Sequence, residues 1–473
     1  MAGEAFAEHL EFPRRRGHVP PSSFRGTAGG AVCGDLIRVD LTVDGDRVAD
    51  AGFEASGCGA AVAAGSAVVA LVRGARVLDA ARVGAGAVAE ALGGLSPGKL
   101  HAADLAADAL HGALGAAVAA VGALPEDRAR TVVAMSGGVD SAVAALLVQR
   151  SAREAVAVTL ELWRDTAGDG EASCCSAHAV RVARSVAHGM GLPHFTLDLR
   201  DAFRAGVVDP FLAGYAAGQT PNPCVRCNGG VRLDAMVAFA DRLGAADLAT
   251  GHYARVTEDG LLRTAVDPAK DQSYMLAAVA PATLARLRFP LGGLTKPEVR
   301  ALAREAGLAV ADKRESQDLC FLAGTGKAAF LARHGGVRDR PGAILDRAGR
   351  EVGGHAGAHH FTVGQRKGIG VAAAEPLYVL ATDARANTVT VGPRAALAAG
   401  SVAVRDAVLH RPEDEVDRVK LRYRARPLPC RVTAHGNRTL TVALDEPADG
   451  PAPGQVACLM RGDVVVGHGV IAG

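Results

Sequence analysis

Short apolar runs alternate with helical stretches between residues 126 and 255 of the chain. The runs TVVAM, AVAVTLEL, HFTLDL and DLATGH each have the composition and the length of a strand. Because strands that alternate with helices form parallel sheets, this pattern predicts a doubly wound parallel sheet. Ligands of such a sheet bind at the carboxyl ends of its strands, so we expect the chemistry of this region there.

The sequence on either side of this region has a different pattern of apolar and polar residues. Residues 102–124 are rich in Ala and predict a helix that ends a first domain, and the PEDRAR stretch that follows predicts a polar linker. From about residue 275 to 335 the pattern is helical, as in KPEVRALAREAGL, which has Pro297 in its first turn and Gly307 at its end. Beyond Pro341, short alternating strands with Gly, Asn and Asp turns predict a small β-barrel. We therefore expect domains at 1–125, 126–255, 256–340 and 341–473.

Behind the first predicted strand comes the sequence SGGVDS, which begins at Ser136. Gly137 and Gly138 allow main-chain N–H groups to approach an anion closely. Ser136 and Ser141 add hydroxyl donors at the start of a helix whose dipole favours phosphate, and Asp140 is a candidate for holding magnesium or orienting phosphates. The chain has no GxxxxGK[ST] element and this turn lacks GxGxxG, which argues against a P-loop phosphotransferase and a dinucleotide-binding unit. The loop therefore predicts chemistry on ATP; the alternative is a Gly-Gly turn capped by serines.

Composition favours an intracellular enzyme of several domains. The 473 residues exceed what one hydrophobic core normally serves, and 49% of them are hydrophobic. The net charge of +2 is small, so binding of nucleic acid requires a local basic patch. The sequence shows no signal peptide and no transmembrane run, so we expect a cytoplasmic protein without membrane contact and with reduced thiols. Its nine cysteines are then candidates for chemistry or metal binding.

Two of the cysteines stand in the sequence CVRC, next to Pro221 and Pro223. A loop bounded by prolines is expected to fix the thiols of Cys224 and Cys227 close together, and Arg226 favours their thiolate forms. Two other cysteines lie in apparent strands of the predicted barrel and are expected to act as structural hydrophobes: Cys430 and Cys458.

A basic segment, LRYRAR, lies at residues 421–426. If it is a strand, its three arginines lie on one face, because side chains alternate along a strand. Such a ribbon binds the phosphates of RNA with a strong dependence on salt. The alternative is an ordinary solvated strand face.

SGGVDS is similar to the signature of the PP-loop ATP pyrophosphatase superfamily, whose members adenylate a carbonyl oxygen and release pyrophosphate. Further stretches follow in the order found in the bacterial tRNA 2-thiouridylases. The resemblance to this family covers about residues 130 to 473. Its motifs are TPNPCVRCN at 220–228, ATGHYAR at 249–255, KDQSYML at 270–276, ESQDLCF at 315–321, FTVGQRKGIG at 361–370 and PLYVL at 376–380.

The resemblance implies ATP-dependent 2-thiolation of the wobble uridine of tRNA. The uridine C2 oxygen is activated as an adenylate, and the target base leaves its stack to reach the pocket. The residue matching Cys320 carries a persulfide from a cysteine desulfurase or sulfur-relay protein, and the residue matching Cys227 assists its release, which leaves a disulfide between them. The implied contacts of ATP, which is bound with Mg²⁺, are Ala134, Met135, Ser136, Gly137, Gly138, Val139, Asp140, Ser141, Leu160 and Gly251. The implied tRNA contacts are Asn222, Pro223, His252, Lys270, Asp271, Gln272, Arg422, Tyr423 and Gln455.

One position departs from the family pattern. Where many thiouridylases carry an acidic residue two positions after the Asn of the TPNPCVRCN stretch, this chain has Cys224. Three thiolates, those of Cys224, Cys227 and Cys320, are then able to hold an iron–sulfur cluster by three corners, which leaves one iron to bind sulfide. We expect the persulfide route and keep the cluster route as an alternative. Alternatives of other classes are a non-catalytic metal or sulfur carrier and a PP-loop enzyme that transfers nitrogen.

The first 120 residues have a resemblance of their own. FAEHLEFPRRRG, VCGDLIRVDL, ASGCGAAVAAGS and GKLHAADLAADAL are similar to motifs of the NifU/IscU-type iron–sulfur scaffold proteins. The family's ligands correspond to Cys33, Asp35, Cys58 and a third cysteine, whose position is Ala102 here, beside His101. A zinc or iron site from the three matching residues and His101 is one reading, and a degenerate scaffold that docks a cysteine desulfurase is the other. The expected fold is thus a multi-domain α/β protein with an α+β scaffold-like N-terminal domain, a PP-loop domain, a small helical tRNA-binding domain and a C-terminal β-barrel.

Overall fold

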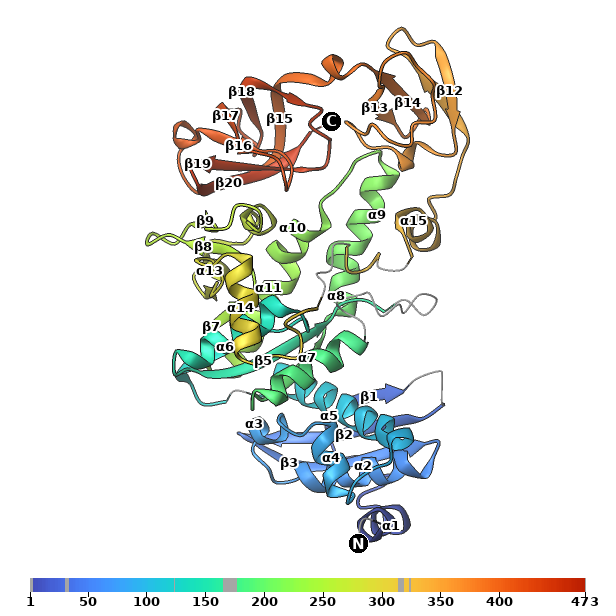
Figure 1. The fold of residues 1–473 in the computed structure, drawn as a ribbon, viewed down its shortest axis with the longest axis vertical. Helices are drawn as coiled ribbons and strands as arrows, with labels where there is room; N and C mark the ends of the chain where they lie inside the picture. The colour runs from blue at the N-terminus through green and yellow to red at the C-terminus, as the bar shows by residue number, and fades with distance from the viewer. Residues whose placement is uncertain are drawn as a thin grey trace. The chain divides into compact units, whose positions relative to one another are not determined.

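The computed structural model of the chain describes residues 3–29, 34–122, 124–164, 177–313, 319–322 and 325–472 (Figure 1). The chain divides into two compact units. The first unit comprises Met1–Arg200, Ala235–His252 and Arg286–Phe321. The second comprises Asp201–Asp234, Tyr253–Ala285 and Leu322–Gly473.

The N-terminal part of the first unit is an antiparallel sheet covered by helices, as expected for an α+β domain. The apolar residues Ile37, Val39 and Leu41 alternate along the middle strand and are fully buried. The strands, in spatial order, are β1 (Phe24–Gly29), β2 (Leu36–Asp44) and β3 (Arg47–Ser56). The helices are α1 (Glu4–Glu11), α2 (Gly59–Val72), α3 (Val77–Ala80), α4 (Ala85–Ala91) and α5 (Leu100–Ala120).

The rest of the first unit confirms the doubly wound parallel sheet. Five strands lie in the order β10-β7-β4-β5-β6, and every neighbouring pair is parallel. Val133 of β4 packs in one core with Ala142 and Ala183 from helices on the sheet. The strands are β4 (Asp127–Ala134), β5 (Glu154–Glu161), β6 (His194–Asp198), β7 (Ala245–Thr250) and β10 (Leu287–Arg288). The helices of this part are α6 (Val139–Arg150), α7 (Ala177–Gly189), α11 (Leu233–Arg242) and α14 (Lys296–Glu305).

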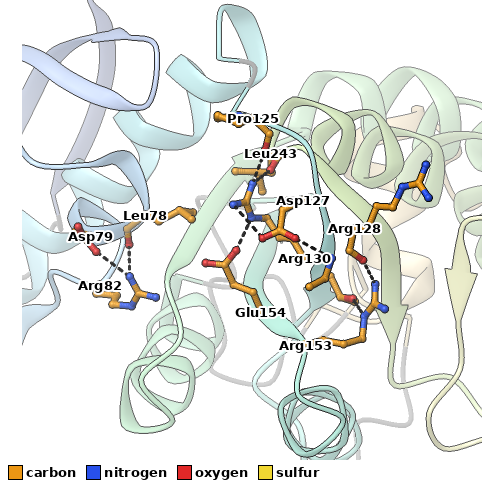
Figure 2. A network of polar contacts seen from close by, with 12 residues as sticks. Leu78, Asp79, Arg82, Pro125, Asp127, Arg128, Arg130, Arg153, Glu154 and Leu243 are labelled. Atoms are coloured by element: carbon orange, nitrogen blue, oxygen red, sulfur yellow. Dashed lines mark hydrogen bonds and ion pairs between the residues drawn. The ribbon is translucent and has the colours of Figure 1, made fainter.

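The predicted polar linker at residues 125–130 is wrong, because strand β4 already begins at Asp127. Figure 2 shows the reason: the buried guanidinium of Arg130 has partners on every side. It donates to the carbonyl oxygens of Pro125 at 3.1 Å and Leu243 at 2.6 Å, and to the carboxylate of Glu154 at 2.7 Å. A charged residue is therefore tolerated in this strand since its hydrogen bonds are satisfied within the fold.

Within the first unit, helix α5 of the N-terminal part packs against strand β6 of the parallel sheet. Three histidine rings gather at this junction: the centroid of His111 lies 5.3 Å from that of His188 and 5.4 Å from that of His194. The backbone carbonyl of His194 lies 2.7 Å from Nδ1 of His111. Gly115 allows the close approach of the helix, because a Cβ there would lie 1.9 Å from the carbonyl oxygen of Thr196. The N-terminal α+β part and the parallel-sheet part of the first unit thus share a buried interface.

The buried histidines make the stability of this junction depend on pH. Burial, followed by the charge of Arg184, lowers the pKa of His111 well below its ordinary value; burial also lowers that of His194, and it lowers the pKa of His188 to about 4. The unfolded chain binds protons at these histidines below about pH 6.5, whereas in the folded chain His188 resists protonation until the pH approaches 4, and His111 and His194 also stay neutral well below their ordinary pKa. The contribution of these neutral histidines to the free energy of unfolding is therefore fully present above about pH 6.5, and it is lost as the pH falls from 6.5 toward 4.

Each neutral buried histidine contributes a slope of up to about 1.4 kcal/mol per pH unit. Urea unfolding of the full chain at pH 7.5 and at pH 5.0 measures the loss. His188→Gln should reduce the difference between the two pH values, whereas His435→Gln, at an exposed position, should leave it unchanged. Equal stability of the wild-type protein at both pH values would contradict the prediction.

The second unit contains two β-structures and several short helices. A four-stranded sheet has the order β12-β11-β14-β13, and six strands in the order β15-β18-β17-β16-β19-β20 close into a barrel through the pairing of β15 with β20. The first set is β11 (Gly342–Leu345), β12 (Glu351–His355), β13 (Tyr378–Asp383) and β14 (Thr388–Gly392). The barrel is β15 (Ala398–Leu409), β16 (Arg418–Lys420), β17 (Leu428–Ala434), β18 (Leu440–Asp449), β19 (Val456–Arg461) and β20 (Val464–Ile471), which β9 (Leu262–Thr264) and β8 (Ala254–Val256) extend. The helices are α9 (Asp209–Ala216), α10 (Pro223–Cys227), α12 (Ser273–Leu276), α13 (Pro281–Leu284) and α15 (Lys327–Gly335), and α8 (Arg200–Phe203) precedes them.

The closed barrel confirms the predicted C-terminal fold and the place of two cysteines in it. Cys430 on β17 and Cys458 on β19 are buried, and burial raises the pKa of each thiol to about 12. Both are therefore small hydrophobes of the barrel, as expected. None of the described helices combines the length and the apolar character needed to span a membrane.

The predicted basic strand at residues 421–426 is wrong. Strand β16 ends at Lys420, and a turn follows in which the amide of Ala425 donates to the carbonyl of Arg422. The guanidinium of Arg422 donates to the carbonyl oxygens of Val363 and Gly450, at 3.2 and 2.6 Å. The arginines therefore do not form a regular ribbon, because internal partners direct them individually.

Candidate nucleotide and thiol sites

The SGGVDS loop joins the carboxyl end of β4 to the first turn of α6, which confirms the predicted strand–turn–helix. Gly137 has φ of +69°, a conformation that favours glycine, and Gly138 is the N-cap residue of α6. The hydroxyl of Ser141 donates to the carbonyl of Gly138 at 3.0 Å and accepts from the amide of Ser136 at 3.2 Å. The loop thus has the open backbone and the helix N-terminus that an anionic ligand requires.

Gly251, at the end of the neighbouring strand β7, lies directly against this loop. A Cβ at Gly251 would lie 2.8 Å from both the carbonyl carbon of Asp140 and the amide nitrogen of Ser141. Only glycine therefore lets the end of β7 lie against the first turn of α6. Of the other implied ATP contacts, Ala134, Met135, Val139 and Leu160 are buried around the same sheet.

Two lysines that the sequence analysis missed contact the loop. Nζ of Lys296 lies 2.6 Å from Oδ1 of Asp140, and Nζ of Lys313 donates to the carbonyl of Gly137 at 2.9 Å. Lys296 is the first residue of α14, whose capping box joins Thr295 and Glu298. The sequence did predict this helix, but not that its first residue reaches a loop more than 150 residues away.

His252 follows Gly251 and is buried. Its Nδ1 lies 2.9 Å from the hydroxyl oxygen of Thr250, and its ring meets that of Phe289 edge-on. The tRNA contact implied for His252 stays a prediction, and it requires a change in the exposure of this side chain.

The segment with Cys224 and Cys227 is a helix and not the predicted loop. Asn222 is the N-cap of α10, and its side-chain oxygen accepts from the amides of Cys224 and Val225 at 3.1 and 3.2 Å. Pro223 occupies the first helical position, where its missing N–H costs nothing. The two thiols, three residues apart, lie on the same side of the helix; Cys224 is partly exposed and Cys227 is buried.

Removal of this cap should expose Cys227. Asn222→Ala loses both hydrogen bonds and should destabilise α10 by about 1 kcal/mol, which increases the open fraction of the helix about five-fold. The rate of alkylation of Cys227 should rise by the same factor, measured by mass spectrometry of iodoacetamide-treated full chain. Asn222→Asp keeps a capping oxygen and should keep the slow rate; equal rates in all three proteins would contradict the role of the cap.

The other implied tRNA contacts of the second unit have partners within it. Asp271 accepts from the amides of Ala265 and Ser273 and lies 3.3 Å from Nζ of Lys420. Gln272 accepts from the amide of Tyr253. Gln455 donates to the carbonyl of Thr220 at 2.7 Å, and the ring of Tyr423 lies 6.4 Å from that of Tyr274. These residues hold the surrounding backbone, and their contact with RNA stays a prediction, as does that of Lys270.

The N-terminal part brings three of the predicted metal ligands together. Oδ2 of Asp35 lies 3.0 Å from Sγ of Cys58 and 2.9 Å from Nε2 of His101. Burial opposes ionisation of Asp35, but hydrogen bonds from Cys58 and His101 lower its pKa. Ala102 is buried in α5 and offers no ligand. Cys33 lies outside the described residues, as does the segment 314–318 before the partly exposed Cys320.

Four family models match consecutive parts of the chain. They are the NifU-like N-terminal domain over residues 3–120, the tRNA methyl transferase HUP domain over 129–324, the tRNA methyl transferase PRC-barrel domain over 328–393 and the aminomethyltransferase beta-barrel domain over 405–471. The last two correspond to the four-stranded sheet and the closed barrel.

Relatives match the same parts in the same order. The bifunctional protein NifU/MnmA of Rubrobacter xylanophilus is 46% identical over 99% of this chain and 98% of its own. The tRNA-specific 2-thiouridylases MnmA of Geotalea uraniireducens and Methylorubrum extorquens are 42% and 45% identical, over 73% and 72% of this chain and 95% and 91% of theirs. The expected fusion of a scaffold-like domain to a PP-loop enzyme is thereby confirmed: the chain belongs to the family of bifunctional NifU/MnmA proteins.

Proposed function

We propose that the protein is a tRNA-uridine 2-sulfurtransferase, which replaces the C2 oxygen of the wobble uridine by sulfur at the expense of ATP. The observation that carries the proposal is the loop from Ser136 to Ser141, an anion-binding turn that meets Gly251 at the carboxyl edge of a parallel sheet. Relatives that bear the name tRNA-specific 2-thiouridylase match nearly three quarters of the chain.

In the first step, ATP lies along residues 134–141 with its phosphates on the amides of the loop. The uridine C2 oxygen attacks the α-phosphorus, the bond to the β-phosphate oxygen breaks, and pyrophosphate leaves. Asp140 would hold Mg²⁺ or orient phosphate, and Lys296 and Lys313, which contact Asp140 and Gly137, would balance the charge of the leaving group. The base is then an O-adenylate whose leaving group is AMP.

In the second step, the outer sulfur of a persulfide on Cys320 attacks C2, and AMP leaves with the former uridine oxygen. The thiolate of Cys227 then attacks Sγ of Cys320, which breaks the bond between Cys320 and the transferred sulfur. The products are 2-thiouridine and a Cys227–Cys320 disulfide, which an external dithiol reduces. A cysteine desulfurase or a sulfur-relay protein supplies the next persulfide.

The direct test is thiolation with the purified full chain. The protein is incubated with unmodified tRNA, ATP, magnesium and a sulfur source, and the tRNA is run on a mercury-containing gel, which retards thiolated RNA. Retardation that requires ATP supports the proposal. Absence of retarded tRNA under both aerobic and anaerobic conditions would refute it, and it would favour a carrier without catalytic activity.

For the N-terminal part we propose a site for zinc or iron at Asp35, Cys58 and His101, with Cys33 as the fourth ligand. Its support is the convergence of a carboxylate, a thiol and an imidazole on one another. Metal analysis of full chains loaded with Zn²⁺ should give one ion fewer for Cys58→Ser than for the wild type. Equal metal content would leave desulfurase docking as the role of this part.

A further inference from the structure

Two histidines and one carboxylate converge in the second unit. Asp339 lies between α15 and β11, and His359 and His360 lie in the 3₁₀ helix η4 (Ala358–His360). Nε2 of His360 lies 2.7 Å from Oδ1 of Asp339, and Nε2 of His359 lies 3.4 Å from the same oxygen. The three ligand atoms all lie within 4.8 Å of one another.

One member of this cluster is poorly satisfied for its degree of burial. The side chain of His359 is 8% exposed, and among the described residues its Nε2 has only the long 3.4 Å contact with Asp339 and no hydrogen bond. A buried polar atom without a hydrogen bond loses the partner that water would supply, so such atoms are rare unless a ligand satisfies them. His360 already uses Asp339, so a further ligand is the simplest partner for His359.

The distances suit a tetrahedral metal ion. Metal–nitrogen and metal–oxygen bonds of about 2.0–2.1 Å in a tetrahedron place the ligand atoms about 3.3 Å apart. The separation of Asp339 and His359 already has this value. The shorter separation of Asp339 and His360 is that of a hydrogen bond, and it needs to lengthen by about 0.6 Å when an ion replaces the proton. Asp339 is exposed and stands outside the helices and strands, so it is able to move.

The ion is accessible from solvent, because the side chain of Asp339 is 65% exposed. A pocket of about 220 Å³ lies beside His359. Three protein ligands with water in the fourth position are a common arrangement for an accessible zinc ion. Around the pocket, polar groups come from separate segments of the second unit: Tyr215, Gln219, Arg338, Arg340, His359 and Asn387.

We propose that Asp339, His359 and His360 bind one divalent transition-metal ion of the Zn²⁺ class, with water in the remaining position. The ion joins the segment after α15 to η4, which directly precedes the FTVGQRKGIG stretch. It is a site separate from the thiol-containing cluster of the N-terminal part, and neither site depends on the other.

The test is cobalt binding to the full chain after treatment with a chelator. Wild-type protein should take up one more Co²⁺ ion than His360→Ala or Asp339→Asn, and the affinity of this ion should fall about 100-fold or more in these variants. The ligands are nitrogen and oxygen only, so the variants should lose this site's share of the visible d–d absorption, while the near-ultraviolet thiolate-to-cobalt band of the cysteine-containing sites stays unchanged. Cys58→Ser should instead reduce the thiolate-to-cobalt band.

His435→Ala is the matched control, since His435 is an exposed histidine of the same unit that binds the hydroxyl of Thr441. It should keep the wild-type number of ions. Both test substitutions are at surface positions, and circular dichroism in the presence of chelator should match the wild type. Unchanged cobalt stoichiometry and an unchanged visible spectrum in both His360→Ala and Asp339→Asn would overturn the proposal.

Discussion

Cys320→Ser and Cys227→Ser should each lower the rate of tRNA thiolation by about 10³-fold or more, while the protein still releases pyrophosphate from ATP in the presence of tRNA. A hydroxyl at residue 320 cannot carry a persulfide, and a hydroxyl at residue 227 cannot displace the transferred sulfur, so each change removes a covalent step and not a binding interaction. The adenylation step uses other residues and should continue until the tRNA is occupied.

The two activities are measured on the same samples, thiolation by mercury-gel mobility and adenylation by pyrophosphate release. Cys430→Ala is the control, because Cys430 is buried in the barrel and has no assigned chemistry. Cys224→Ser separates the two sulfur routes. The persulfide route predicts that most activity remains, whereas a loss as large as that of Cys227→Ser would indicate the three-cysteine cluster. Full activity of Cys320→Ser would contradict both routes.

Gly251→Ala should weaken ATP binding about 100-fold and reduce pyrophosphate release to the same extent at low ATP concentration. The added Cβ would lie 2.8 Å from backbone atoms of Asp140 and Ser141, and backbone is unable to give way as a flexible side chain does. The loop must therefore shift by a substantial fraction of an ångström, and displacements of about 1 Å at a reacting group cost about 10²-fold.

The measurement is calorimetric titration of ATP into the full chain. Gly86→Ala is the matched control in the same unit, because a Cβ at this helical position meets nothing within 4 Å. It should bind ATP as the wild type does. Wild-type affinity in Gly251→Ala would show that the nucleotide does not lie against the SGGVDS loop.

The sequence predicted what local patterns determine. The strands β4 to β7 are runs of buried residues, and the SGGVDS loop follows the first of them directly, so strand, turn and helix are all encoded within a few residues. The capped helix α14 was predictable for the same reason, since Thr295, Glu298 and Pro297 lie next to one another in the chain.

The wrong or missed predictions have a different cause: the residues concerned contact partners that are distant in the sequence. The local sequence around Arg130 is typical of a linker. In the fold this residue lies in a strand, because Leu243 and Glu154 accept its hydrogen bonds. The sequence pattern placed Arg422 in a strand. In the fold its guanidinium donates hydrogen bonds to the carbonyls of Val363 and Gly450, which the local pattern does not indicate. Lys296 and Lys313 likewise contact the SGGVDS loop only because of the tertiary fold.

The prediction of a loop at the CVRC segment was wrong for a local reason. Its prolines indicate a loop, but a proline is equally favourable at the first position of a helix that follows an Asn cap. The capping hydrogen bonds stabilise a helix here.

The most direct test of the account follows the oxygen that the base loses. tRNA with ¹⁸O at C2 of the wobble uridine is incubated with the protein, ATP, magnesium and a sulfur donor, and the products are analysed by mass spectrometry. The account predicts one ¹⁸O atom in AMP for each thiolated uridine. Label in water or in pyrophosphate, with unlabelled AMP, would contradict adenylation of the base at the SGGVDS loop.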